Sequence, residues 1–282
     1  MFLIGGTTYA VYRWGWLSLA ILAPLAGYAL WRGISIHNPD NWISLLPPLA
    51  IGSFCGIFYR AGWPLKRYLV LCSLAISILL SGGYYYMKIY QGRDIIRESG
   101  AQVSEMLKNS SIPEEQRKQL SQDLDEWTPT ASRLIPFSTF FYGLLLSALA
   151  LLLTDPIVRH GMSGSTNANN GLNYYRLNDY TIFIFIAGWV LFMLADKAHH
   201  PVLNAAGLNM GLITSLLYLV QAFGVVKFML VKKGLPSSLL PFGVFLMIIL
   251  GMEATLFSAV FMTGIGACDL WADFRKLEKS AG

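Results

Sequence analysis

The chain has 282 residues, of which 55% are hydrophobic and 13% are charged, and its formal net charge is +5. A mean hydropathy of +0.50 indicates a membrane protein rather than a soluble domain. In a soluble protein the positive charge would suggest nucleic acid as a partner. Here the basic residues fall mainly at the ends of apolar runs, where they anchor helices at lipid headgroups, so no nucleic-acid partner is expected.

Apolar runs occupy much of the chain, and each is long enough, or nearly so, to cross about 30 Å of hydrocarbon, which takes roughly 20 residues. The runs are continuous rather than alternating with period two, so helices are favoured over a barrel. We therefore predict an all-α fold: one integral domain over residues 1–282, a polytopic transmembrane helical bundle of about six to eight spans embedded in the lipid bilayer. The runs are 16–31, 42–59, 68–87, 134–154, 180–195, 203–226 and 239–268.

The first run carries small residues at Ala20, Ala23 and Gly27. Small side chains let helix backbones approach closely in lipid. This face is predicted to be a contact surface for another helix, either of the same chain or of a partner.

Residues 88–133 form the largest interruption and contain seven basic and eight acidic residues. Ser111 and Glu114 match a capping box after a turn at residues 109–113. Two short amphipathic helices are predicted, forming an extramembrane hairpin. Their apolar stripes could dock on the rim of the bundle, lie in the membrane interface or contact another protein.

Residues 155–179 form the second interruption, and Gly, Ser and Asn dominate its middle. That composition predicts a flexible polar loop. Farther along, Asp196, His199 and His200 have the spacing with which one helix could present metal ligands. A polar boundary at the end of a span is the commoner situation, and no metal site is predicted.

A stripe of small and polar residues recurs along the run 203–226 with spacings of three and four, which places it on one helix face. Close helix packing alone would explain the stripe. The alternative is a polar ligand pocket lined by this stripe and the last run. The stripe consists of Asn204, Gly207, Gly211, Thr214, Tyr218 and Gln221.

Glu253 is the only charged residue between Lys233 and Asp269. A centred acidic residue in a bilayer costs about 2.5–3.5 kcal/mol, so such residues usually face a cavity or a partner. Two readings stay open: ligand or ion binding together with Tyr218 and Gln221, or a protonated carboxyl that hydrogen-bonds a neighbouring helix.

Topology depends on whether the run 239–268 is one crossing. If the run is one crossing, the basic C-terminus lies on the opposite side of the membrane from the other short basic segments, and the positive-inside rule disfavours this arrangement. Read as a broken or re-entrant pair, it returns the C-terminus to their side, and about 30 residues is long for one crossing. The basic residues expected on the cytoplasmic side are Arg13, Arg60, Lys66, Arg67, Arg159, Arg176, Lys227, Lys232 and Lys233.

Three segments carry a resemblance to a known family: residues 176–180 (RLNDY), 221–224 (QAFG) and 264–275 (GIGACDLWADFR), with 204–211 between the first two. In these segments the chain resembles the YybS-like family of predicted bacterial membrane proteins, whose function is unknown. That family is distantly similar to the S components of energy-coupling-factor transporters. The resemblance implies the bacterial inner (cytoplasmic) membrane, a membrane-embedded solute site and an ABC-type energising module as partner, which Ala20, Ala23 and Gly27 would contact.

The C-terminal segment suggests a further contact surface. Trp271 and Phe274 are predicted to anchor a short interfacial helix, with Asp269, Asp273 and Arg275 facing water. A partner protein is the alternative occupant of Trp271, Phe274 and Arg275.

Two functions follow. The first is an integral membrane solute-binding or transport subunit, with a ligand site at Asn204, Tyr218, Gln221 and Glu253. The second is a structural or assembly subunit that binds membrane proteins through the hairpin and the small-residue faces. No catalytic residues can be paired, so we expect neither an enzyme nor a cofactor.

Overall fold

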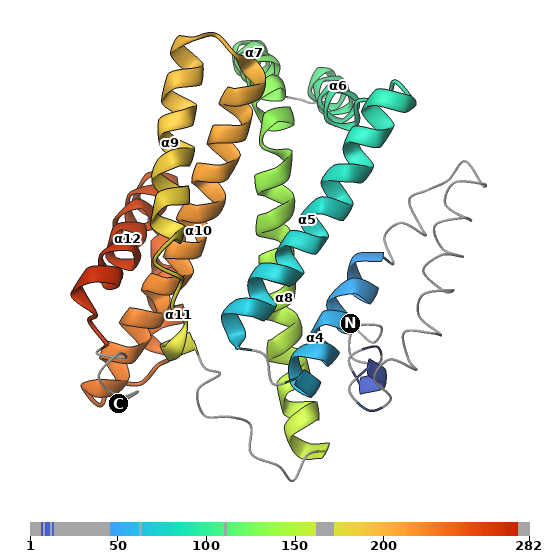
Figure 1. Ribbon diagram of the computed structural model, residues 1–282. Helices are drawn as coiled ribbons and strands as arrows, with labels where there is room; N and C mark the ends of the chain where they lie inside the picture. The colour runs from blue at the N-terminus through green and yellow to red at the C-terminus, as the bar shows by residue number, and fades with distance from the viewer. Residues whose placement is uncertain are drawn as a thin grey trace.

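Figure 1 presents a computed structural model that describes residues 7, 9–11, 13, 46–61, 64–109, 112–161 and 172–275. The described chain is helical throughout and contains no strand, as expected. Its helices are α4 (Leu46–Ala61), α5 (Leu65–Tyr90), α6 (Ile95–Lys108), α7 (Glu114–Arg133), α8 (Ile135–Gly161), the 3-10 helix η2 (Leu172–Tyr174), α9 (Thr181–Lys197), α10 (Pro201–Lys232), α11 (Leu239–Ile249) and α12 (Met252–Ala272).

Within the described residues, α5, α10 and α12 are long and apolar enough to cross a membrane, and a fourth candidate combines α7 with α8 across a 74° bend. The expected six to eight spans are therefore not confirmed. The first run, with Ala20, Ala23 and Gly27, lies outside the described residues. The last run is not one helix, because it breaks at Gly251.

The first half of the bundle packs around α5 and α8, with α4 beside them (Figure 1). Tyr68 is fully buried at this junction, where its hydroxyl donates to the Ser147 carbonyl at 3.1 Å and lies 3.4 Å from Cys55 Sγ. Ile51 and Phe140 complete the surrounding apolar core. A buried phenol avoids the cost of an unsatisfied hydroxyl when that hydroxyl is paired, and this pairing joins three helices.

In the second half, α9 and α10 approach each other so closely at Gly188 and Gly207 that neither position has space for a side chain. A Cβ on Gly188 would lie 2.6 Å from the Gly211 amide nitrogen, and a Cβ on Gly207 would overlap the Phe192 backbone. Every residue of the predicted small and polar stripe on α10 is buried. For Gly207 and Gly211 the packing interpretation is confirmed, because their missing side chains set the distance between the helices.

The bend between α7 and α8 is held by α10. It leaves the Arg133 carbonyl and the Phe137 amide outside a continuous helical ladder. Asn209 supplies both partners, since its amide group donates to Arg133 at 2.7 Å and its side-chain oxygen accepts from Phe137 at 2.8 Å.

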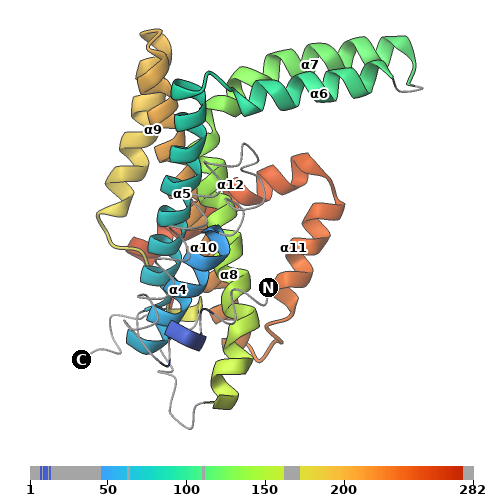
Figure 2. The same cartoon turned by 90° about the vertical axis from the view of Figure 1, so that its right-hand side faces the viewer.

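The predicted hairpin is present as α6 and α7, and Figure 2 shows that it projects sideways from one end of the bundle. Neither helix has a buried residue, so the described hairpin does not dock on the rim of the bundle. The Lys88 ammonium lies 2.7 Å from Asp94, which also accepts from the Tyr84 hydroxyl at 3.0 Å and caps α6. Helix α7 begins at Glu114 after Pro113, while Ser111 of the expected capping box lies outside the described residues.

The second interruption is shorter than predicted. Helix α8 continues through Asp155 to Gly161, so the expected loop boundary at residue 155 is wrong. Residues 172–179 follow a defined path that begins with η2. The Gly, Ser and Asn content of the middle of this segment predicts a loop but does not locate the end of the preceding helix, and that helix has 20 residues, 135–154, before Asp155 to support its extension.

The last apolar run forms two helices that meet at Gly251, whose φ of 103° disfavours any residue with a side chain. In Figure 2, α11 rises and α12 turns back from its end, so the pair forms a V. Helix α11 has 11 residues, which correspond to about 16 Å of rise, or half of a bilayer core of about 30 Å. The structure therefore favours the broken-pair interpretation of this run.

We expect Gly207→Ala to destabilise the protein, because the added methyl group overlaps the α9 backbone and the helices must separate. Overpacking of this kind costs about 1–3 kcal/mol. The measurement is the thermal midpoint of the purified protein in detergent. Gly264→Ala is the matched control, since no atom lies within 4 Å of the added Cβ. Equal midpoints for the two variants would contradict the close approach of α9 and α10.

Acidification is expected to weaken the base of the hairpin. The hydrogen bond from Lys88 lowers the pKa of the Asp94 carboxyl below its ordinary value. A lowered folded-state pKa stabilises the fold above the unfolded pKa, about 3.9, and the contribution is lost as pH falls through the folded value. Thermal midpoints measured below about pH 4 should fall less in Asp94→Asn than in the parent protein. Asp125→Asn, at an exposed site on α7, should leave the parent profile unchanged.

Candidate functional site: a buried polar cluster between α10 and α12

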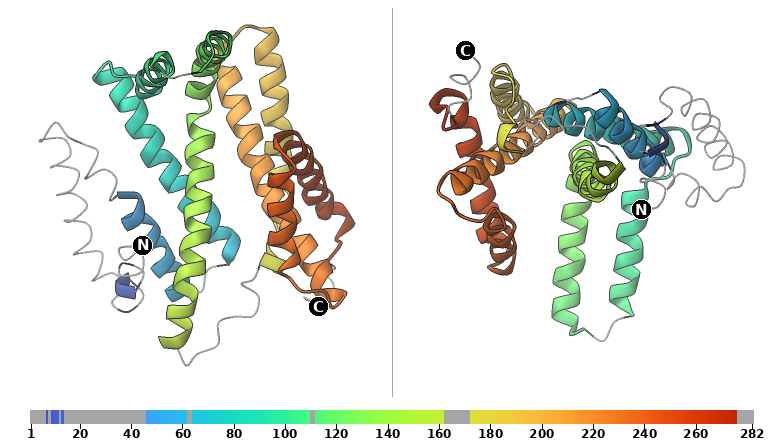
Figure 3. Two further views of the ribbon diagram at one scale, coloured as in Figure 1. Left: turned by 180° about the vertical axis from the view of Figure 1, so that it is seen from behind. Right: turned by 90° about the horizontal axis from the view of Figure 1, so that it is seen from below.

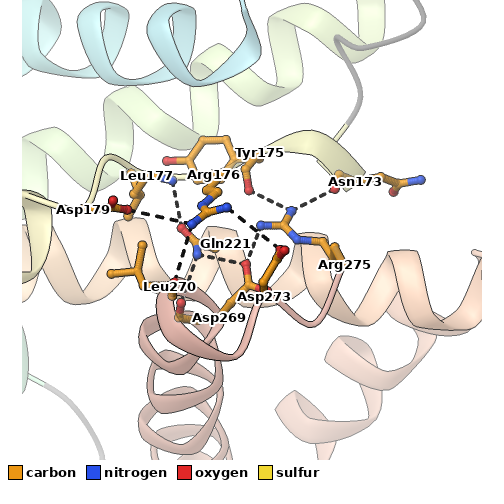
Figure 4. Close-up of polar contacts among 11 residues, drawn as sticks. Asn173, Tyr175, Arg176, Leu177, Asp179, Gln221, Asp269, Leu270, Asp273 and Arg275 are labelled. Carbon is orange, nitrogen blue, oxygen red and sulfur yellow. Dashed lines mark hydrogen bonds and ion pairs between the residues drawn. The ribbon is translucent and has the colours of Figure 1, made fainter. Parts of the chain in front are cut away.

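A cluster of polar side chains lies where the end of α12 meets α10 and the segment after η2 (Figure 4). Gln221 comes from α10, Asp269 from α12, and Arg275 from the turn that follows α12. All three residues are buried, and Asp269 and Arg275 are at most 3% exposed. Charges at this depth require partners, because removing them from water costs several kcal/mol per ion, roughly, before any pairing.

The centre of the cluster is an ion pair. Arg275 Nη2 donates to Asp269 Oδ2 at 2.5 Å, while its Nη1 donates to the carbonyls of Asn173 at 2.8 Å and Tyr175 at 2.9 Å. Asp273 ends α12 in the left-handed region, with φ 38° and ψ 55°, a conformation that Asp tolerates better than most residues. This turn brings Arg275 back onto Asp269, six residues earlier in the chain.

Gln221 connects the ion pair to the segment before α9. Its side-chain oxygen accepts from the Leu177 amide at 2.9 Å, and its nitrogen donates to the Gly266 carbonyl and to Asp269 Oδ2, both at 3.1 Å. A buried amide with both ends used specifies one arrangement of three chain segments.

Two glycines make this approach possible. A Cβ on Gly266 would overlap the Tyr218 carbonyl of α10, and a Cβ on Gly224 would lie 2.5 Å from the Leu172 carbonyl. Larger residues at either position would separate α10 from α12 or from η2 and pull the ion pair apart.

Arg176 forms a looser outer layer. Its guanidinium lies 3.9 Å from both Asp179 and Asp273, and it contacts the Leu270 carbonyl at 3.5 Å. Because Arg176 precedes α9 and Asp273 follows α12, the contact places both segments at the same end of the bundle. The C-terminal end of α12 therefore returns to the side from which α9 starts.

Several buried polar atoms in the cluster retain unused hydrogen-bonding capacity. Among the described residues, Asp269 Oδ1, Arg275 Nε and the hydroxyls of Tyr175 and Tyr218 have no hydrogen-bond partner. Burial raises the pKa of the Tyr175 hydroxyl above its ordinary value, which keeps it a neutral donor. Such atoms can donate or accept a hydrogen bond to water or a small polar group, whereas no group of three possible metal ligands occurs in the part of the chain that the structure describes.

The structure separates the four residues predicted to bind a ligand. Tyr218 and Gln221 are buried on α10, and the Tyr218 ring packs edge-on against Phe185. Glu253 is exposed in the first turn of α12, 13 residues before Gly266, a separation of about 20 Å along the helix. The expected convergence of Glu253 with Gln221 is wrong, because α12 crosses α10 near Gly266 instead.

Asn204 lies at the opposite end of α10, where its amide donates to Asp196 at 3.3 Å. Asp196, His199 and His200 do not form the metal-ligand arrangement that their spacing on one helix would give. Helix α9 ends at Lys197, and His199 takes a left-handed φ of 53°, so the three residues do not share a helix face.

The predicted contact residues at the C-terminus also separate. Trp271 is 71% exposed and Phe274 is 39% exposed, as an interfacial contact requires. Asp269 and Arg275 were expected to face water, and this is wrong because each is the buried counter-ion of the other. The sequence concealed the pair, since a spacing of six is not a helical spacing and only the turn at Asp273 creates it.

Gln221, Leu177, Gly266, Asp269 and Arg275 lie in the three segments that carry the family resemblance. The sequence supplied these segments separately, with nothing to show that they meet. Their convergence makes this cluster the structural centre of the C-terminal half of the protein.

The helical architecture and the apolar spans define a helical integral membrane protein. The chain belongs to the family of predicted membrane proteins designated DUF2232, whose profile matches residues 16–270. Comparisons with curated proteins and with solved structures gave no match.

We expect Asp269→Asn to lower the stability of the protein sharply, because it leaves a buried Arg275 cation without a counter-charge. Breaking one side of such a pair costs about 3–5 kcal/mol. Asp179→Asn, at a side chain that is 79% exposed, should change the midpoint little. The test is a double-mutant cycle with Arg275→Met, followed by thermal unfolding in detergent. Additive effects of the two substitutions would show that the pair is not coupled.

Proposed function

We propose that the protein is a solute-binding or transport subunit of a bacterial inner-membrane system. The observation that carries this proposal is the break at Gly251, halfway along an apolar run, with Glu253 in the first helical turn after it. Broken helices in transporters supply polar backbone and side chains at the midplane of the bilayer, where solutes and coupling ions bind. A carboxyl group at such a break is a candidate ligand for a cationic or hydrogen-bonding solute.

The break also requires a cover. Irregular backbone within the bilayer persists only where protein buries it or where it lines a water-filled cavity. Leu250 and Met252 flank Gly251 and are 62% and 73% exposed, and Glu253 is exposed as well. A partner protein that packs against α11 and α12 would supply the cover and complete the solute site.

The resemblance to the YybS-like family, and through it to S components, supports the same proposal. It supplies the class of partner, an ABC-type energising module. The site that we propose differs from the pocket expected from the sequence, because Glu253 acts at the helix break, apart from Tyr218 and Gln221.

The proposed orientation places the short basic connections in the cytoplasm. Arg176, Lys232, Lys233 and Arg275 end up at one end of the bundle because α11 and α12 together return the chain to the side it left. This removes the conflict that a single crossing would create under the positive-inside rule. The hairpin, in which basic and acidic residues nearly balance, lies at the opposite end (Figure 1).

A second candidate function is a structural or assembly subunit without a solute. This function is favoured by α12, because only 11% of the apolar stretch of this helix is buried within the chain. The exposed side chains of this helix, large and apolar, would then form a contact with another membrane protein. They include Leu256, Phe257, Val260 and Phe261.

The test is purification of the intact protein in mild detergent, with mass spectrometry of the copurifying proteins and of the retained small molecules. We expect an ABC-type ATPase or a stoichiometric small ligand, and we expect Glu253→Gln to remove it because the neutral amide cannot replace the carboxylate charge. Asp125→Asn is the control for loss of an exposed acidic group.

Equal retention of the ligand and the ATPase by Glu253→Gln would contradict the proposed site. A defined partner without ATPase activity, and without a retained ligand, would establish the assembly function instead.

A further inference from the structure

The α6–α7 hairpin exposes large apolar side chains that nothing in the described chain covers. Met106 is 70% exposed and Trp127 is 62% exposed, and Ile95, Val103 and Leu120 are exposed too. Among the described residues, the hairpin is tied to the bundle at its base, through Asp94 and the bend at residue 134. Its apolar residues therefore serve a contact outside the bundle.

These side chains lie on one face of the hairpin. Successive residues of an α-helix turn by about 100°, so Ile95, Val103 and Met106 fall within about 80° of each other on α6. Leu120 and Trp127 fall within about 20° of each other on α7. On each helix the apolar stripe is about a quarter turn from the half-buried side that meets the other helix. Because the two helices are antiparallel, the quarter turn from the half-buried side to the apolar stripe leads to the same face of the hairpin on both helices.

The orientation of this face follows from the handedness of the helices. Figure 1 views the hairpin from its base, with α6 to the right of α7, and Figure 3 shows both helices extending away from the bundle. With right-handed helices in this order, the shared apolar face points down, toward the spanning helices. The charged residues Arg97, Glu105, Lys108 and Lys118 lie on the side of the hairpin away from that face.

The hairpin is also at the correct level to touch lipid headgroups. It starts where α5 ends and finishes where α8 begins, and α7 makes an angle of 74° with α8. Helices that continue from span ends at this angle lie along the membrane surface. Exposed Tyr86 and Tyr90, near the C-terminal end of α5, mark the same interfacial layer.

We propose that the α6–α7 hairpin is an interfacial membrane-binding element that lies on the bilayer beside the spanning helices. Its apolar face, defined by Ile95, Val103, Met106, Leu120 and Trp127, is inserted at the boundary between headgroups and acyl chains. Seven basic and eight acidic residues in the segment 88–133 leave almost no net charge, so apolar burial holds the hairpin and anionic lipid is not required. The hairpin fixes the depth and rotation of α5 and α8 in the bilayer.

The experiment uses the full-length protein in phosphatidylcholine vesicles, with a nitroxide label on one introduced cysteine at a time. Cys268, the exposed native thiol, is first replaced by Ser, while Cys55 and Cys72 are buried. The labels are placed at Met106→Cys and Leu120→Cys on the apolar face. Glu105→Cys and Lys118→Cys are the matched controls on the charged side.

We expect labels at positions 106 and 120 to collide more with oxygen than with a water-soluble nickel chelate, because oxygen concentrates in lipid. Labels at 105 and 118 should show the reverse preference. Addition of phosphatidylglycerol to the vesicles should leave these preferences unchanged. All four positions are exposed, so the substitutions preserve the packing, and a monodisperse elution profile checks this.

Three outcomes would overturn the proposal. Equal access of the nickel chelate at all four positions would show that the hairpin stands in water. Shielding of positions 106 and 120 from both reagents would show that a protein, either a partner or a second copy of the chain, covers the face. Insertion that appears only with anionic lipid would contradict the assignment to apolar burial.

Discussion

The C-terminal half of this protein depends on the buried ion pair between Asp269 and Arg275. Neither charge could remain at that depth alone, and each is satisfied only when α12, α10 and the segment after η2 are all in place. Gln221 makes the same segments depend on one another, because its side-chain oxygen accepts from Leu177 before α9 and its side-chain nitrogen donates to Gly266 on α12. A cluster of this kind is a modest source of stability but a strong source of specificity, since any other arrangement leaves a buried charge unpaired.

The ion pair also explains how a loosely packed helix pair keeps its place. Helix α12 buries little of its apolar surface within the chain, and α11 contributes less than a full span. In lipid, burial of apolar side chains gives no preference for protein over acyl chains, so polar bonds and close packing must hold the pair. Asp269 and Gly266 anchor one end of α12 against α10, whereas the end with Glu253 is free to meet a solute or a partner.

Sequence patterns predicted the features that depend on local chemistry. The apolar runs indicated helices, the spacing on 203–226 indicated a buried face, and the charged segment 88–133 indicated a helical hairpin. The patterns did not predict that Glu253 and Gln221 are far apart, because the crossing point of α10 and α12 is set by Gly266 and Tyr218. The Asp269–Arg275 pair was equally out of reach, since it requires a left-handed turn at Asp273.

The two ends of the protein use opposite means to hold position in the membrane. At the end with η2, opposite charges are buried within the chain and bind α12 to the bundle. At the other end, Asn209 fixes the bend at α8, and the hairpin beyond it leaves its apolar surface outside the chain. A rigid bend is of little use to a segment that lies free in water, but it is necessary for a segment whose face must meet a flat surface at a fixed depth. The geometry of Asn209 and the direction of the apolar face therefore support the same conclusion: the bilayer is the surface against which this hairpin folds.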